Sequence, residues 1–257
     1  MQVYRLMTAA GETVYATPGK KSYRKVEGSL REGFEKTDIA IIGVEKILPP
    51  LDPVCIYGIG LNYLGHVEEW GERPQEPLIF MKAPTSVIPT HERIVLPEVA
   101  PEHVDFEAEL AVVIGKPARN ITASLAGEVI AGVTCANDVT ARDCQKKDGQ
   151  WVRAKSFDTF CPLGPCLQTD WQDAEKIEGR LNGDLYQEAY FTELIFSVPE
   201  LVEYLSHQFT LRPGTVILTG TPEGVGFARD PEEYLLPGDT YEVTIPAVGT
   251  LENKVSG

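Results

Sequence analysis

The stretch HVDFEAELAVVIG, residues 103–115, joins three acidic residues to an apolar run. The five uncharged residues before Gly115 predict a strand that is buried on both faces. Side chains alternate along a strand, so an extended segment would bring Asp105, Glu107 and Glu109 to one face. Clustered carboxylates raise one another's pKa unless a cation lies among them. A solvated strand face is the alternative, but the strand continues into the apolar run, which favours burial and a cation.

A set of oxygen ligands alone favours a hard cation, Mg²⁺, Mn²⁺ or Ca²⁺, over zinc. A third ligand is needed. The stretch CANDVTARD offers Asp138, at the end of a predicted short strand (GVTCAND), and Asp143. An Asn-Asp pair taken alone is more typical of a turn or a helix cap. Two carboxylates from one strand and one from the next would leave about half of an octahedral shell open for a substrate.

The composition limits the classes of function. The chain has 257 residues, enough for one large domain or for one with a small appendage. Its formal net charge of −15 disfavours nucleic acid and anionic membranes as partners. No stretch is apolar enough for a membrane helix, and the N-terminus lacks the pattern of a signal peptide. The five cysteines are odd in number and lack CxxC spacing, so we expect a cytoplasmic protein with reduced thiols.

Two regions of the chain differ in their patterns. Residues 1–50 alternate short apolar runs (QVYRL, IAIIG) with turn-rich basic stretches, which predicts a small β-rich N-terminal lobe. A proline-rich link, LPPLDP at 48–53, leads to a main domain at 51–257. Strands with scattered helices and no regular βαβ alternation favour an α+β, β-rich mixed fold over a doubly wound sheet.

The main domain contains few predicted helices. TASLAGEVIAG (122–132) has helical spacing, with Thr122 as a cap. SVPELVEYLSHQF (197–209) has one apolar face, and Ser197 and Glu200 form a capping-box pattern. VCIYGIGLNY predicts a strand that runs into a glycine loop, and LRPGTVILTGTP and LLPGDTYEVTIP each predict a strand after a Pro-Gly turn.

Seven segments, in chain order, carry a family resemblance: GIGLNYLGHVEEWG, MKAPTSV, VDFEAELAVVIGK, NDVTARDCQ, AKSFDTFCPLGP, LTGTPEGVG and VGTLENKV. Together they resemble the fumarylacetoacetate hydrolase family. The resemblance extends from about Gly58 to Val255, and the ordered combination is more specific than any single segment. It implies the mixed β-sandwich roll of that family's C-terminal type, and a homodimer.

The resemblance also implies a set of site residues. The family's E-x-E matches Glu107 and Glu109, and its D-x-[ST]-A-R-D stretch opens at Asp138. These three would bind one divalent metal, Mg²⁺ or Mn²⁺, which Ca²⁺ could replace in crystals. The family's water-activating dyad, on a mobile lid, matches His66 and Glu69. Its lysine matches Lys155, and the threonine that contacts the substrate carboxylate matches Thr221. Further substrate-binding positions match Arg142, Gln145 and Asn62.

Elementary chemistry supports the dyad and the lysine. His66 and Glu69 are neighbours at i, i+3 on a helical turn, whereas the competing Glu68 is at i+2 and does not face the histidine. Without the family, HVEEWGERP would indicate an exposed polar loop and Lys155 a solvated surface charge. Near a metal, Lys155 would be a fixed cation that stabilises an enolate. The lid departs from the family pattern at Leu64 and Gly65, and the glycine would loosen a helix there by about 1 kcal/mol.

These expectations predict a divalent-metal-dependent hydrolase that cleaves a C–C bond of a small 2-oxo acid, of acylpyruvate or fumarylpyruvate type. The metal would chelate the carboxylate and keto oxygens and stabilise an enolate, while water activated by His66 attacks a further carbonyl. The resemblance equally permits oxaloacetate decarboxylation, keto–enol tautomerisation of oxaloacetate, or isomerisation of a hydroxymuconate-type diacid. A non-catalytic metal-dependent module that binds a dicarboxylate is a second alternative, and it would leave the dyad and the lysine without a role.

Overall fold

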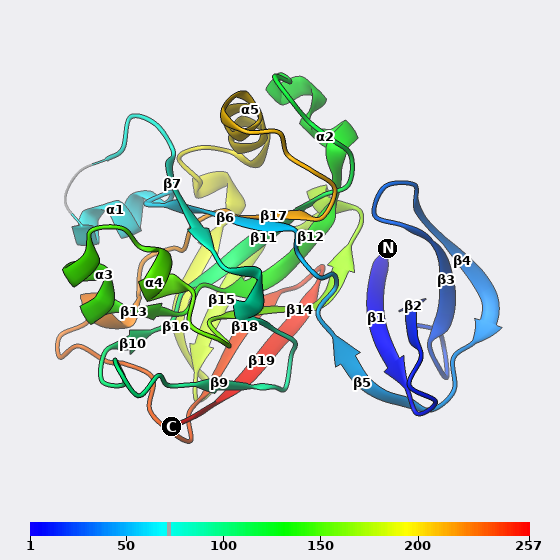
Figure 1. The fold of residues 1–257 in the computed structure, drawn as a ribbon, viewed down its shortest axis with the longest axis horizontal. Helices are drawn as coiled ribbons and strands as arrows, with labels where there is room; N and C mark the ends of the chain where they lie inside the picture. Colours follow the sequence, from blue (N-terminus) through cyan, green and yellow to red (C-terminus); the bar gives the residue numbers. More distant parts are fainter. Residues whose placement is uncertain (71–72) are drawn as a thin grey trace.

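The computed structural model describes residues 1–70 and 73–257, and the chain is rich in strands (Figure 1). The N-terminal strands are β1 (Gln2–Thr8), β2 (Thr13–Thr17), β3 (Arg24–Ser29), β4 (Gly33–Ala40) and β5 (Val44–Leu48). The later strands are β6 (Cys55–Gly60), β7 (Leu78–Lys82), β8 (Val87–Ile88), β9 (Arg93–Val95), β10 (Val104–Asp105), β11 (Ala108–Ile114), β12 (Ile130–Asn137), β13 (Thr140–Ala141), β14 (Cys161–Gln168), β15 (Lys176–Leu181), β16 (Asp184–Tyr190), β17 (Thr215–Leu218), β18 (Thr240–Ile245) and β19 (Gly249–Ser256). The α-helices are α1 (Leu64–Trp70), α2 (Ala126–Val129), α3 (Arg142–Asp148), α4 (Val152–Lys155) and α5 (Val198–Gln208).

Two mixed sheets stack to form the main body (Figure 1). The large sheet has the order β4-β3-β2-β1-β14-β12-β11-β17-β6-β7, with β5 beside β1 and β8 beside β14. The second sheet has the order β16-β15-β18-β19-β9, and β10 and β13 form a short separate pair. Most neighbours are antiparallel, but β6 and β17 run parallel. The predicted α+β, β-rich sandwich is therefore confirmed.

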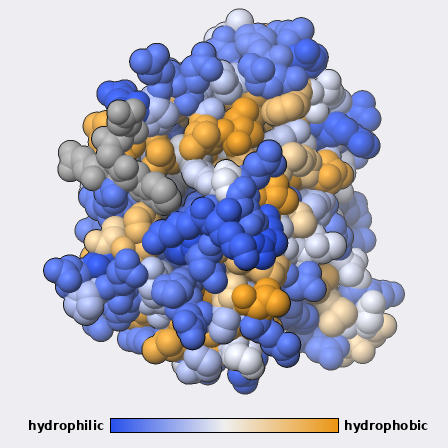
Figure 2. Space-filling view, turned by 60° about the vertical axis from the view of Figure 1, so that its left-hand side comes forward, coloured by the Kyte–Doolittle hydropathy of each residue, from blue (hydrophilic) through white to orange (hydrophobic). Residues whose placement is uncertain are grey.

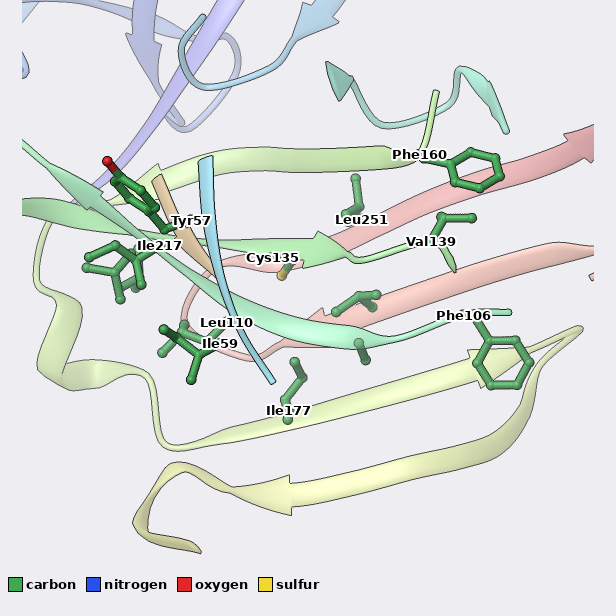
Figure 3. Close-up of a cluster of buried hydrophobic side chains, with 14 of the residues drawn as sticks. Tyr57, Ile59, Phe106, Leu110, Cys135, Val139, Phe160, Ile177, Ile217 and Leu251 are labelled. Atoms are coloured by element: carbon green, nitrogen blue, oxygen red, sulfur yellow. The ribbon is translucent and has the colours of Figure 1, made fainter. Parts of the chain in front are cut away.

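Strand β11 lies inside the large sheet, between β12 and β17, and all of its residues are buried. Leu110 belongs to the apolar cluster that also holds Ile177 and Leu251 of the second sheet (Figure 3). Ala111 and Val113 belong to a different apolar cluster. Apolar packing on both sides explains why the sequence after Glu109 shows no polar alternation. The prediction of a strand buried on both faces is confirmed.

The N-terminal strands lie to one side of the main body (Figure 1). They join the large sheet where β1 pairs with β14, with Gln2 opposite Gln168. Residues 49–54 contain no strand or helix, as the proline-rich link predicts. The expected strand at IAIIG is only partly right, because β4 ends at Ala40 and residues 41–43 lie outside strands. The division into domains at 1–50 and 51–257 remains a prediction.

The two predicted helices have different outcomes. Helix α5 begins after Ser197, whose backbone N–H donates to the Glu200 carboxylate (2.8 Å), as the capping-box pattern predicts. The helix predicted at 122–132 is wrong in its extent: α2 is one turn long, and β12 begins at Ile130. Pairing within the buried sheet outweighs the helical spacing there. The side chain of Thr122 makes no cap hydrogen bond.

The face that carries α1 and α3 is mostly hydrophilic, with smaller apolar patches between the polar groups (Figure 2). Within the described ranges, no helix is both long and apolar enough to cross a lipid bilayer. The cysteines are free thiols, and four of the five are buried. The cytoplasmic location and the homodimer remain predictions.

Candidate active site

Three buried carboxylates meet where β11 begins and β12 ends. Glu107, Glu109 and Asp138 each offer an oxygen, and these oxygens lie within 4.8 Å of one another. The exposed fractions of the three residues are 4%, 1% and 0%. The structure therefore brings the three predicted metal ligands together. The alternative third ligand, Asp143, is exposed on α3, where its carboxylate accepts the backbone N–H of Cys144.

The pairing of β11 with β12 produces this arrangement. The Asp138 N–H donates to the Glu107 carbonyl (2.9 Å), and the Glu107 N–H donates to Asn137 Oδ1 (3.0 Å). Residues 106 and 107 lie outside strands, so the expected continuous strand over 105–109 is wrong. Asp105 is separated from the glutamates by this break. Its Oδ1 accepts the N–H of Gly226 (2.7 Å), and it is not part of the carboxylate cluster.

The surroundings of Glu109 disfavour the ionised form of its carboxyl group. Burial raises the pKa of Glu109 well above its usual range, and Asp138 and Glu107 raise it further. Burial also opposes the ionisation of Glu107, but Lys155 and Arg142 outweigh it and hold the pKa of Glu107 well below its usual range. A divalent cation among the three carboxylates would relieve the repulsion at Glu109, and an all-oxygen donor set suits a hard cation. The residues present fit the predicted metal.

Two lysines contact the cluster, and only one was predicted. Lys155, on α4, lies 2.8 Å from Glu107 Oε2 and 2.6 Å from Asp138 Oδ2. Its own burial would lower the pKa of Lys155, but the two carboxylates raise it above its usual value, so the ammonium stays charged. Lys82, on β7, donates to Asp138 Oδ1 at 2.5 Å. The segment MKAPTSV contains this lysine, but its sequence gives no sign that the side chain reaches a residue 56 positions away.

The guanidinium of Arg142, on α3, is bound by neighbouring side chains of the protein. Its Nε donates to Asp105 Oδ2 (2.8 Å), and its Nη1 donates to Gln145 Oε1 (3.0 Å). Its Nη2 lies 2.7 Å from Glu107 Oε1 and 2.8 Å from Asp105 Oδ2, so it forms ion pairs with both carboxylates. The guanidinium carbon lies 4.5 Å from the centroid of the Phe227 ring. These contacts position Glu107, and they orient the Gln145 amide.

The predicted dyad forms on α1. His66 Nδ1 and Glu69 Oε2 are 2.6 Å apart, and Glu69 Oε1 accepts the N–H of Gly224 (2.8 Å). This contact occupies Nδ1, so Nε2 is the ring nitrogen that Glu69 leaves available. Glu69 therefore ties the helix to the turn at 220–226 as well as orienting the imidazole. The side chain of Glu68, the competing partner, lies outside the described part of the chain.

The structure explains why a glycine, and not a larger residue, occurs at position 65. A Cβ atom added there would lie 1.9 Å from Glu223 Oε2, so the glycine lets the Glu223 carboxylate lie against α1. Leu64, the other departure from the family pattern, is 52% exposed. Helix α1 forms despite the glycine, and His66 is buried in this position.

Two predicted substrate-binding residues have their polar groups engaged. The Asn62 amide donates to the Phe196 and Thr219 carbonyls (3.0 and 2.7 Å) and accepts the Phe196 N–H (2.8 Å). The Thr221 hydroxyl donates to the Ala108 carbonyl (3.0 Å). Asn62 thus fastens the base of α1. Thr221 lines the pocket, but its hydroxyl proton is already used within the protein.

Gln187, on β16, was not predicted and joins both sides of the site. Its Nε2 donates to Thr221 Oγ1 (2.7 Å) and to the Pro222 carbonyl (2.8 Å). Its Oε1 accepts the N–H of Ala108 (2.9 Å) and the hydroxyl of Tyr241 (2.7 Å). The residue is 1% exposed. A neutral glutamine in a strand gives no sequence signal for such a role, because its partners come from three other segments.

One pocket gathers most of the predicted residues: His66, Glu107, Glu109, Arg142, Gln145, Lys155 and Thr221. Ile59, Phe80 and Trp151 form an apolar part of its wall. Glu69 and Asp138 contact it through His66 and Lys155. The His66–Glu69 pair, the carboxylate cluster and the Lys155 ammonium therefore share one pocket.

Residues 55–256 match the family model described as fumarylacetoacetate (FAA) hydrolase C-terminal. Oxaloacetate tautomerase Fahd2a, mitochondrial, from Rattus norvegicus is 41% identical over 218 residues, which cover 82% of this chain and 69% of that protein. Oxaloacetate tautomerase YisK from Bacillus subtilis is 41% identical over 214 residues, or 80% of this chain and 70% of that protein. The crystal structure of 5-carboxymethyl-2-hydroxymuconate delta-isomerase from Mycobacterium smegmatis is similar with a TM-score of 0.88 and 36% identity, covering 100% of this chain and 99% of that one.

Proposed function

Because the chain belongs to the fumarylacetoacetate hydrolase family, we propose that it is a divalent-metal-dependent enzyme that moves a proton on a small 2-oxo dicarboxylate, with keto–enol tautomerisation of oxaloacetate as its reaction. The observation that carries this proposal is the buried His66–Glu69 pair, which shares a pocket with the carboxylate cluster and with Lys155. The names of the two tautomerases and of the isomerase described above support it.

The dyad would act on the carbon next to the keto group. His66 Nε2 takes a proton from that carbon, and Glu69 stabilises the imidazolium that results. The C–H bond electrons form the new carbon–carbon double bond, and the keto oxygen takes up negative charge and then the proton that the imidazolium releases. The reverse sequence returns the enol to the keto form. This chemistry needs no bond cleavage beyond that C–H bond.

The other site residues would stabilise negative charge on the substrate and keep the neighbouring side chains in position. Lys155 is a buried cation whose pKa lies above its usual value, so it can face the negative charge on the substrate oxygen without losing its own proton. Arg142 acts indirectly, because it holds Glu107 and orients Gln145. The amide nitrogen of Gln145 is the group of that pair that could donate to a substrate carboxylate.

Mg²⁺ or Mn²⁺ is the proposed cofactor, held by Glu107, Glu109 and Asp138. When bound, it would polarise the keto and carboxylate oxygens of the substrate and so acidify the neighbouring C–H bond. The substrate would be a small 2-oxo acid.

C–C hydrolysis of an acylpyruvate or fumarylpyruvate is the second candidate. The observation that favours it is the His66–Glu69 pair itself, because an imidazole held by a carboxylate can also take a proton from water. The same dyad could then deprotonate a water molecule instead of a carbon.

The test follows enol–keto exchange of oxaloacetate by ¹H NMR with Mn²⁺ or Mg²⁺. Acetylpyruvate and fumarylpyruvate are offered in parallel. The proteins are the wild type, His66→Ala, and His207→Ala as a matched control, because His207 is exposed on α5. We expect faster exchange with the wild type and with His207→Ala, and loss of the acceleration with His66→Ala.

Other outcomes assign other reactions. Pyruvate released from an acylpyruvate together with the free acid would establish the hydrolase, and pyruvate from oxaloacetate alone would establish a decarboxylase. No reaction with any of the three compounds, while metal still binds, would favour the non-catalytic binding module.

A further inference from the structure

Lys82 is a buried cation that the reaction proposed above does not use. It lies on β7, and its side chain is fully buried. Its ammonium donates to Asp138 Oδ1 at 2.5 Å and to the Val139 carbonyl at 3.3 Å. A buried ammonium requires such partners, because desolvation of an unpaired charge is costly. Lys82 and Asp138 are thus bound to each other in the interior.

The two oxygens of Asp138 have separate partners. Oδ1 contacts Lys82, and Oδ2 lies 2.6 Å from Lys155. Lys155 lines the pocket and Lys82 does not, so a cation that enters the pocket would compete with Lys155 for Oδ2, while the fully buried Lys82 keeps Oδ1. An oxygen that accepts a short charge-assisted hydrogen bond is a weaker ligand for a second cation, since both cations compete for the same lone pairs.

We propose that Lys82 is a positioning residue that determines metal specificity, because it restricts Asp138 to one ligating oxygen. The proposal rests on the metal dependence proposed above. Mg²⁺ requires near-octahedral coordination, whereas Ca²⁺ accepts more oxygens and readily uses both oxygens of a carboxylate. With Oδ1 held by Lys82, Asp138 offers one oxygen, which suits Mg²⁺ or Mn²⁺ better than Ca²⁺. With Oδ1 released, Asp138 could chelate, and Ca²⁺ would gain more than the smaller ions.

The first experiment compares Ca²⁺ and Mn²⁺ affinities by calorimetric titration of the full chain without substrate. Lys82→Met keeps the length of the side chain and removes the donor. Lys36→Met is the matched control, because Lys36 is exposed on β4 and carries the same charge. We expect the ratio of Ca²⁺ to Mn²⁺ affinity to rise about tenfold in Lys82→Met, because Ca²⁺ alone can use the extra oxygen. The control should keep the wild-type ratio.

An unchanged ratio in Lys82→Met, with circular dichroism showing a folded protein, would overturn the proposal. If this variant does not fold, a crystal structure of the wild type with Mn²⁺ decides: Asp138 should bind through one oxygen and keep Lys82 on the other, and chelation through both oxygens would overturn the proposal. Neither readout uses turnover. A wild type that binds Mn²⁺ in this way but does not tautomerise oxaloacetate would contradict the proposed reaction alone.

Discussion

The Gln187 side-chain oxygen accepts the backbone N–H of Ala108 at 2.9 Å. Ala108 is the residue between two of the proposed metal ligands, Glu107 and Glu109. The nitrogen of the same amide donates to Thr221 and Pro222. One neutral side chain therefore sets the distance between the glutamate pair and the opposite wall of the pocket.

Gln187→Leu should weaken both folding and metal binding. The substitution leaves the Ala108 N–H and other buried polar groups without partners, which costs about 2–4 kcal/mol in the free energy of unfolding. Urea unfolding measures that loss, and calorimetric titration measures Mn²⁺ affinity in the protein that remains folded. Gln208→Leu is the control, because Gln208 is exposed on α5 and should change neither quantity. Unchanged Mn²⁺ affinity in Gln187→Leu would show that the glutamates keep their positions without the amide.

Glu69→Gln should lower the rate of oxaloacetate tautomerisation by about a hundredfold, the scale of general acid–base catalysis. The amide can still accept from the Gly224 N–H, but its NH₂ group would donate to His66 Nδ1. The proton of the imidazole would then lie on Nε2, which is the wrong tautomer for a base at that atom. Steady-state kinetics gives the rate, and Mn²⁺ affinity should stay at the wild-type value. Equal rates for the two proteins would remove the dyad from the mechanism.

Gly65→Ala tests the contact between α1 and Glu223. The added Cβ atom would lie 1.9 Å from Glu223 Oε2, so the carboxylate must move. Alanine also favours a helix over glycine by up to about 1 kcal/mol, so the melting temperature should change little while kcat/KM falls. The double variant Gly65→Ala with Glu223→Ala removes the clash and should regain much of the lost kcat/KM. If both variants have the wild-type kcat/KM, the closeness of Glu223 to α1 has no part in catalysis.

The charge of Glu109 should make the metal-free protein less stable as the pH rises. The pKa of Glu109 in the folded protein lies above its ordinary value of 4.5, so its favourable contribution is complete below pH 4.5 and is lost as the pH rises through the folded-state pKa. In a chelator, Glu109→Gln should therefore gain more stability over the wild type at pH 8 than at pH 5. Urea unfolding at both pH values measures this difference.

A bound divalent metal should offset the loss of stability that the ionised Glu109 causes. At about 100 times its dissociation constant, Mn²⁺ should add about 2.7 kcal/mol to the free energy of unfolding of the wild type, and less to Glu109→Gln, which offers a neutral ligand. A wild type that is as stable in a chelator as in Mn²⁺ would contradict metal binding by the folded state.

Several parts of the site could be predicted because their signals are local. The E-x-E pair at Glu107 and Glu109, the apolar run after it, and the i, i+3 spacing of His66 and Glu69 each follow from neighbouring residues in the sequence. The structure places these groups together, with Asp138 beside them. The predicted continuous strand over 105–109 failed because the Glu107 N–H donates to the Asn137 side chain and not to a strand carbonyl, and this contact is not visible in the local pattern.

Other parts depended on which distant segments meet. Arg142 and Thr221 match substrate-binding positions of the family, yet Asp105, Gln145 and Ala108 engage their polar groups. The pair of Arg142 and Gln145 is a local i, i+3 contact on α3, but no short-range pattern predicts Asp105 or Ala108 as partners.

The sequence by itself determined the chemistry of the site: which carboxylates, which imidazole and which ammonium are present, and which of them lie within a few residues of each other. The tertiary structure alone decided that Lys82 holds one oxygen of Asp138 and that Gln187 joins Ala108 to Thr221. The physical reason is that a buried polar group must find a partner wherever the packing of the sheets places one. That partner is chosen by the strand pairing of the whole chain, and spacing along the sequence does not encode it.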